Sequence, residues 1–360
     1  MIPVTRPFLP PRETYEEYLK GIWARNWLTN HGPLVTELEI KLKQYLSLNH
    51  LLFLSNGTIA LQIAIKALKL KGEVITTPFS YVATTSSLIW EGCSPVFVDI
   101  DPDSLTIDPT KIEEAITKKT SGILATHVYG NPCNIEAIRE IAEKHNLKVI
   151  YDAAHCFGVK YKGKSVFEYG DISTASFHAT KVFHTIEGGA VITKEKSLFE
   201  NMSYLRNFGH ESPYEFELAG INGKNSEFHA AMGLCNLNYI EDIIAKRKIL
   251  IEYYLQKLQG FNLRTIKINQ HTEWNFSYFP IILENEPQLQ KTAKELEKYY
   301  IYTRRYFFPS LNNLSYYRKK SNVPNSDSIA PRVLCLPLYN ELSIEEIDMI
   351  TQIIYHSLNF

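Results

Sequence analysis

Lys181 lies in a stretch of sequence that suits a nucleophilic amine. It ends the segment 176–181, which follows a β-rich run, and a glycine pair at 188–189 comes soon after it. An amine in a largely apolar neighbourhood loses hydration, which lowers the pKa of its ammonium form and lets it attack a carbonyl group. Ser176 offers a hydroxyl to an anion nearby. Taken alone, Lys181 is more often an ordinary surface lysine, because lysine is rarely buried.

A phosphate site is indicated at residues 55–58, which directly precede a helical pattern. Glycine allows a close backbone approach, and the free amides at the start of a helix can bind a phosphate dianion, here at Gly57 and Thr58. Ser, Asn and Thr are also the residues that most often cap helices. An ordinary helix cap therefore explains the same pattern.

Asp152 and His155 come at and after the end of an apolar run at 149–152. Ligands of open α/β sheets bind beyond the carboxyl ends of the strands, so a carboxylate at this point is well placed for chemistry. Asp152 could keep a ring nitrogen protonated, and His155 could hydrogen-bond a neighbouring ring oxygen. A helix cap at Asp152 and a partly buried structural histidine at 155 are the plain alternatives.

A fourth candidate segment covers residues 220–227 and contains Asn222 and Lys224. It opens a helix with small residues at 230, 231 and 233, which permit close packing of elements, including packing across a subunit interface. Packing alone would also explain the segment.

An α/β framework is predicted to position these candidates. Between about residues 50 and 195, short β-rich runs alternate with longer amphipathic stretches, which is the pattern of a parallel sheet with crossover helices. Strands are expected at 74–77, 96–99, 123–127, 149–152, 174–177 and 190–193, and helices at 58–68, 112–116 and 135–145.

The alternation stops near residue 237. One long helix is expected over 237–258, or from an earlier start near Glu227, and a smaller domain follows it. We expect an N-terminal segment at 1–30 that packs on the small domain, a large domain at 31–240 and the small domain at 241–360.

Composition excludes several classes of protein. The 360 residues carry a formal net charge of -1 without a dense run of Lys and Arg, so a nucleic-acid interface is not expected. No uncharged apolar run is long enough to span a bilayer, and the first residues lack a signal peptide. The five cysteines are scattered, which predicts neither a disulfide framework nor a zinc site and fits a reducing cytoplasm.

Taken together, these stretches resemble the DegT/DnrJ/EryC1/StrS family of nucleotide-sugar aminotransferases, and most of all its members that form dTDP-4-amino-4,6-dideoxyglucose. The resemblance covers nearly the whole chain, at residues 27–33, 56–58, 78–84, 127–130, 152–155, 176–181 and 220–227. It implies the fold of the fold-type I pyridoxal-phosphate enzymes: a large domain with a mostly parallel central sheet between helices, and a smaller α+β C-terminal domain.

The resemblance also implies a role for each matching residue toward pyridoxal 5'-phosphate. Lys181 would form a Schiff base with the cofactor, Asp152 would pair with the pyridine nitrogen, and His155 would lie near the ring hydroxyl. The remaining matches imply phosphate binding by Gly57, Thr58 and Ser176, ring stacking by Tyr81, phosphate binding in a neighbouring subunit by Asn222, and substrate contacts by Lys224 and Tyr306.

Two of these matches carry further implications. The role of Asn222 implies a homodimer with shared active sites. Lys224 stands where many relatives have Arg, so the charge is kept but the planar fork for bidentate pyrophosphate binding is lost.

The implied reaction moves an amino group from L-glutamate to a nucleotide-linked keto sugar. It passes through pyridoxamine 5'-phosphate and releases 2-oxoglutarate. His155 resembles relatives that act on C4 of the sugar, whereas relatives acting on C3 tend to have Gln there. The expected acceptor is therefore dTDP-4-keto-6-deoxy-D-glucose, and a 3-keto sugar is the alternative.

Three other functions are alternatives to this one. Sugar dehydratases of the same family have His in place of the catalytic lysine, so Lys181 argues against that reaction. A cofactor-binding sensor without turnover would keep its colour when L-glutamate is added. A nicotinamide-dependent enzyme would need a G-x-G-x-x-G fingerprint, which is missing after the first strand.

Overall fold

The central element of the protein is a seven-stranded sheet, seen in a computed structural model that describes residues 1–317 and 319–359. The strand order is β1-β9-β8-β5-β4-β2-β3. The five neighbours from β8 to β3 run parallel, whereas β9 pairs antiparallel with both β8 and β1. The strands are β1 (His50–Leu54), β2 (Glu73–Thr76), β3 (Ser94–Phe97), β4 (Thr120–Thr126), β5 (Lys148–Asp152), β8 (Ile172–Ser176) and β9 (Gly189–Thr193).

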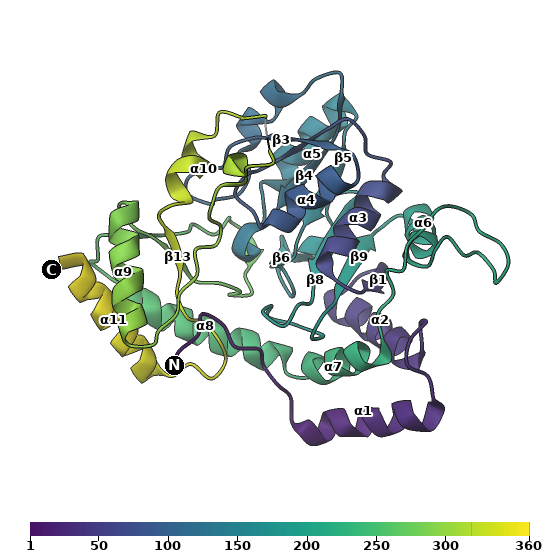
Figure 1. Ribbon diagram of the computed structural model, residues 1–360, viewed down its shortest axis with the longest axis horizontal. Coiled ribbons are helices and arrows are strands. Elements are labelled where there is room, and N and C mark those ends of the chain that lie inside the picture. The colour runs from purple at the N-terminus through teal and green to yellow at the C-terminus, as the bar shows by residue number, and fades with distance from the viewer. Residues whose placement is uncertain (318, 360) are drawn as a thin grey trace.

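Helices cover both faces of this sheet because successive side chains of each strand point to opposite sides. In β5, Val149 and Tyr151 pack into one buried cluster and Ile150 into another. The first cluster lies under α2 (Pro33–Leu46), α5 (Ile135–His145) and α7 (Glu227–Leu237), and the second under α3 (Gly57–Ala67), α4 (Val82–Trp90) and α6 (Lys196–Arg206). This arrangement, visible in Figure 1, confirms the predicted α/β architecture with a mostly parallel sheet.

Three local expectations were wrong or incomplete. Strand β1 was not predicted, since a short continuous apolar run does not distinguish a strand from a buried helix. Residues 112–116 form no α-helix; two separate 3₁₀ turns, Pro109–Lys111 and Glu113–Ala115, occupy this region. The long helix is divided into α7 and α8 (Ile240–Lys257). At the break, the Asn238 side chain donates to the carbonyl of Leu234, an acceptor that a continuous helix would give to a backbone N–H.

The rest of the chain builds a second core. It contains α9 (Glu286–Lys298), α11 (Ile344–Asn359) and a sheet of β10 (Arg264–Thr265), β12 (Pro280–Ile282) and β13 (Val333–Cys335). A third sheet joins β6 (Lys160–Tyr161) and β7 (Lys164–Ser165) to β11 (Thr272–Glu273). Helix α8 contributes to both cores, with Ile240 and Ile243 in the first and Leu250 and Tyr254 in the second.

The N-terminal segment divides between the two cores. Ile2 pairs with Ile301 and packs into the second core. Helix α1 (Arg12–Arg25) departs from the expectation for residues 1–30, because it lies against α7 and buries Ile22 in the first core. The boundary near residue 240 stays a prediction. Within residues 1–317 and 319–359, no helix combines the length and apolarity that a membrane crossing requires.

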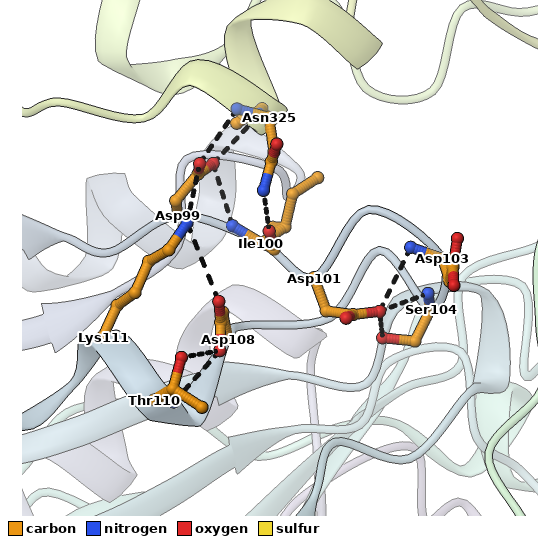
Figure 2. A network of polar contacts seen from close by, with 10 residues as sticks. Asp99, Ile100, Asp101, Asp103, Ser104, Asp108, Thr110, Lys111 and Asn325 are labelled. Carbon is orange, nitrogen blue, oxygen red and sulfur yellow. Dashed lines mark hydrogen bonds and ion pairs between the residues drawn. The ribbon is translucent and has the colours of Figure 1, made fainter.

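Asp99 ties the C-terminal half of the chain to the central sheet. Its buried carboxylate accepts hydrogen bonds from the backbone N–H groups of Asn325 (2.9 Å) and Ser326 (2.8 Å) at the start of α10 (Pro324–Ile329), as Figure 2 shows for Asn325. No side chain of α10 itself caps the helix. Asp99 therefore serves as the N-terminal cap of a helix far away in the sequence.

Replacing this cap gives a test of how the two halves are held together. Asp99→Ala should lower the free energy of unfolding by about 3 kcal/mol, because buried N–H groups lose their acceptor. The matched control is Asp101→Ala: this more exposed carboxylate also accepts several bonds, from Asp103 and Ser104, but water can replace it. Urea unfolding measures both variants, and equal losses would contradict the capping role.

Candidate active site

A cavity of about 360 Å³ opens beyond the carboxyl ends of β4, β5 and β8. The register places Thr126 opposite Asp152 and Asp152 opposite Thr174, so side chains from three strands meet at one edge of the sheet. This is where open α/β sheets bind ligands. The predicted residues that line it are Gly57, Thr58, Tyr81, Asp152, His155, Ser176, Lys181 and Tyr306.

Lys181 reaches this cavity from the loop between β8 and β9. The loop is closed by backbone hydrogen bonds from Phe177 N–H to the Gly188 carbonyl (2.7 Å) and from Thr185 N–H to the Phe177 carbonyl (2.9 Å). The Lys181 amine donates to the Tyr278 hydroxyl over 3.2 Å. Burial lowers the pKa of Lys181, and the negative charge of Asp152 partly opposes this. Lys181 is thus a half-buried lysine of the cavity with a lowered pKa, and not the ordinary surface lysine.

Asp152 ends β5 with its carboxylate buried beneath the cavity. One oxygen accepts from the Thr84 hydroxyl (2.7 Å) and the other from the Ala154 backbone N–H (3.2 Å). Burial raises the pKa of Asp152, while these two hydrogen bonds and the Lys181 charge lower it. The carboxylate is held in one orientation and lines the cavity, ready to pair with a cationic group of a ligand.

His155 is positioned by a backbone donor. The Tyr129 N–H donates to His155 Nδ1 over 3.0 Å, and Tyr129 has a left-handed backbone conformation (φ 57°). Burial lowers the pKa of His155 well below its usual range, and the Lys181 charge lowers it further, so the ring is neutral. Because Nδ1 accepts, the proton of the neutral ring lies on Nε2. The ring can therefore donate one hydrogen bond to a ligand.

The start of α3 forms the other end of the cavity. The Asn56 side chain accepts from the Ile59 N–H (2.9 Å), and Gly57 and Thr58 occupy the first turn, where backbone amides have no partner inside a helix. A Cβ on Gly57 would lie 2.9 Å from the Ser176 Cβ, so only glycine fits here. Two amide-bearing residues and the Ser176 hydroxyl can thus surround one anion.

Known proteins resemble this chain over its whole length. The profile of the DegT/DnrJ/EryC1/StrS aminotransferase family matches residues 11–355. The chain belongs to this family. A dTDP-4-amino-4,6-dideoxy-D-glucose transaminase of Shigella dysenteriae is 45% identical over 98% of this chain and 97% of the relative, and one of Escherichia coli is 43% identical over 98% of each. The family and transaminase predictions are confirmed.

Solved structures of aminotransferases have the same fold. DesI, crystallised in the presence of its TDP-sugar product, superimposes with a TM-score of 0.94 at 31% identity and covers 99% of this chain and 93% of DesI. A putative PLP-dependent aminotransferase of Bacillus cereus gives a TM-score of 0.91 at 27% identity, covering 98% of this chain and 99% of that one.

The polar groups that line this cavity fit the cofactor of a PLP-dependent aminotransferase. It requires an anion site, an acceptor for a protonated ring nitrogen, a donor to a ring oxygen and an amine that can react with an aldehyde. The α3 start with Ser176, the buried Asp152, the Nε2–H of His155 and Lys181 meet these four requirements.

Several cavity residues of this aminotransferase were not predicted. Thr84, Tyr278 and Phe307 line the same space, and Thr84 hydrogen-bonds Asp152 directly. Thr84 lies in the family motif at 78–84, so its position in that motif could have identified it as a site residue. Tyr278 and Phe307 carried no local signal, because they approach Lys181 and His155 only through the folding of the C-terminal half.

Asn222 and Lys224 are not among the described residues that line the cavity of their own chain. Asn222 is exposed and pairs with Asn207. The Lys224 amine donates to Asn207 Oδ1 (2.7 Å) and lies over the Phe208 ring. Both belong to the segment between α6 and α7, part of which projects from the body of the aminotransferase at the right of Figure 1.

The burial of His127, which follows cavity residue Thr126, predicts that the free energy of unfolding depends on pH. It is buried, Nδ1 accepts from the Cys133 N–H (3.0 Å), and burial lowers its pKa to about 3. The unfolded histidine has a pKa of about 6.5, so the folded state binds fewer protons between these values. The stabilising contribution is complete above the unfolded pKa and is lost as the pH falls below it.

The variant His127→Asn keeps an acceptor near Nδ1 and removes the titrating group. Below the unfolded histidine pKa, the free energy of unfolding of the parent should fall more steeply with decreasing pH than that of the variant, by up to about 1.4 kcal/mol per pH unit. Urea unfolding over a pH series measures both slopes. Parallel slopes would show that His127 titrates normally in the folded protein.

Proposed function

We propose that this aminotransferase transfers the amino group of L-glutamate to dTDP-4-keto-6-deoxy-D-glucose in the cytoplasm, giving the 4-amino-4,6-dideoxy sugar nucleotide and 2-oxoglutarate. The observation that carries the proposal is the convergence of the Lys181 amine, the buried Asp152 carboxylate and neutral His155 in one cavity. The names of the relatives that are 45% and 43% identical support the acceptor.

Pyridoxal 5'-phosphate is the proposed cofactor, in its aldehyde and amine forms. When bound, it supplies a carbonyl that exchanges amino groups and a ring that withdraws electrons from the reacting carbon. Gly57, Thr58 and Ser176 would hold its phosphate, and Tyr81 would stack on its ring from the mouth of the cavity, where the tyrosine is partly exposed. His155 Nε2 would donate to its ring oxygen.

Asp152 and Lys181 would perform the chemical work of the protein. The Asp152 carboxylate would accept a hydrogen bond from the protonated ring nitrogen and so stabilise its positive charge, and the Thr84 hydroxyl holds the carboxylate in place. Lys181 would take a proton from the α-carbon of the amino donor and deliver it to the cofactor carbon on the other side of the transferred nitrogen. Its lowered pKa makes the neutral amine available for the first of these transfers.

The positions of Asn222 and Lys224 support the proposal of a homodimer with shared active sites. Neither lines the cavity of its own chain among the described residues. Asn222 is exposed, and the Gly223 carbonyl between them accepts from the Ser55 N–H (2.9 Å) beside the start of α3. Asn222 would contact the phosphate site of a second copy and Lys224 the pyrophosphate of the sugar nucleotide there. Tyr306 would contact the substrate within its own subunit.

Incubation with L-glutamate and pairs of dTDP-linked keto sugars tests the proposed reaction. We expect 2-oxoglutarate and a 4-amino sugar nucleotide from the 4-keto compound, each identified by mass spectrometry. Amination only of the 3-keto isomer would show that the acceptor is the alternative, 3-keto sugar. A relative that is named for a 3-amino product is 31% identical to this chain. Persistent cofactor colour with L-glutamate and no 2-oxoglutarate would indicate a sensor.

A further inference from the structure

Tyr278 contacts the reacting atom of the cavity from a distant part of the chain. Its hydroxyl accepts a hydrogen bond from the Lys181 amine over 3.2 Å, although the two residues are 97 positions apart. The ring lies 4.7 Å from the ring of His155 and 5.6 Å from that of Tyr306, measured between centroids. A side chain in this place can act directly on the amine that moves protons.

Residues 274–278, named here the anchor segment, hold Tyr278 in this position. The indole N–H of Trp274 and the hydroxyl of Ser277 both donate to the Tyr129 carbonyl, each over 2.8 Å. The Asn275 amide donates to the carbonyls of His155 (2.8 Å) and Phe157 (2.9 Å). Three of the five side chains thus bind the backbone carbonyls of Tyr129, His155 and Phe157, which leaves the Tyr278 ring little freedom.

Gly130 shows how closely the anchor segment fits. A Cβ at this position would lie 2.6 Å from Asn275 Oδ1 and 3.0 Å from Ser277 Oγ, and the backbone has φ 80°. Only glycine combines this conformation with so close an approach. The close packing of the anchor segment on Gly130, which helps to position Tyr278, therefore depends on residues of both segments.

We propose that Tyr278 is a positioning residue for Lys181, whose hydroxyl accepts a hydrogen bond from the lysine ammonium after proton removal and keeps that ammonium in the cavity. This inference rests on the proposed function, in which Lys181 takes the substrate proton. The hydroxyl acts as a neutral partner, because burial raises the pKa of Tyr278 far above its ordinary value. A charge-assisted bond stabilises the ammonium more than the amine and so strengthens Lys181 as a base.

Packing alone would require only the ring of Tyr278, so the variant Tyr278→Phe separates the two roles. In cofactor-free protein, trace acetylation over a pH series followed by mass spectrometry reports the pH at which Lys181 becomes half-reactive. Without the hydroxyl, the ammonium loses a partner, and this pH should fall by about one unit. The other titratable groups near Lys181 are the same in the parent and in Tyr278→Phe: Asp152, His155, Cys156, Tyr81 and Tyr306.

A second measurement uses the cofactor-loaded enzyme. The rate at which L-glutamate bleaches the bound cofactor should fall about 10-fold in Tyr278→Phe at saturating donor, with little change in the half-saturating concentration. A weaker base slows proton removal without altering donor binding. A change in half-saturation alone would assign Tyr278 to substrate binding and overturn the proposal.

The matched control is Tyr129→Phe, which removes a hydroxyl from the same aromatic cluster. The Tyr129 hydroxyl donates to the Tyr306 carbonyl and not to Lys181. The labelling pH of Lys181 should therefore stay unchanged in this variant. If Tyr278→Phe does not fold, Ser277→Ala loosens the anchor segment and should shift the labelling pH in the same direction.

An unchanged labelling pH in folded Tyr278→Phe would overturn the proposal. The labelling experiment needs neither cofactor nor sugar, so its result is independent of whether the proposed amino transfer occurs. Failure of the parent enzyme to aminate any keto sugar would contradict the proposed function and leave the labelling result to decide the contact between Tyr278 and Lys181.

Discussion

The Lys181→Ala enzyme is expected to lose amino transfer by at least about 10⁴-fold while remaining folded. In the proposed function, the variant removes both the group that attaches the cofactor and the base that moves the substrate proton. No other lysine is among the described residues that line the cavity. Borohydride reduction followed by mass spectrometry should find the cofactor mass on a peptide containing Lys181 in the parent and no such peptide in the variant.

Two comparisons make this result specific. Lys181→Arg keeps a cation but cannot attach to the cofactor, so it should be inactive as well. Small primary amines added to Lys181→Ala should restore part of the lost rate by replacing the missing base. Turnover by Lys181→Ala at the rate of the parent would refute the assignment of this lysine.

Asp152→Asn is expected to reduce amino transfer by about 10³-fold, because the preorganised negative charge beneath the cavity is removed. The amide is similar in shape and can still accept from the Thr84 hydroxyl, so the fold should persist. An amide cannot keep a ring nitrogen protonated. Stopped-flow absorbance with L-glutamate measures the loss, and the absorption spectrum of bound cofactor should change with it.

Asp171→Asn is the matched control for this variant. Like Asp152, Asp171 accepts a hydrogen bond from a backbone N–H, in this case that of Val149 in β5 over 2.7 Å. It lies at the opposite end of the strand from Asp152. The control should lose some stability and keep its rate of amino transfer. Equal losses of rate in both variants would mean that Asp152 supports only the fold.

Local sequence patterns were sufficient to predict many of the helices and strands of the α/β framework. Helix α5 was predicted at its observed bounds, 135–145, because its apolar residues recur at helical spacing; the structure adds that the Asn134 side chain caps it. The strands next to the cavity were predicted within a few residues. Breaks such as the one at Asn238 depend on a single side chain competing for a backbone carbonyl, which helical periodicity does not reveal.

By itself, the sequence predicted which residues would carry the chemistry near the sheet: Asp152 ends one predicted strand, Lys181 follows another, and strand ends of a parallel sheet meet at one edge. Only the tertiary structure decided what surrounds them. The partners of Asp152, His155 and Lys181 come from α4, from the turn at Tyr129 and from the anchor segment. Apart from the Ala154 N–H, from which Asp152 also accepts, the nearest of them is 26 positions away and the farthest 97, so no local pattern of spacing records these contacts.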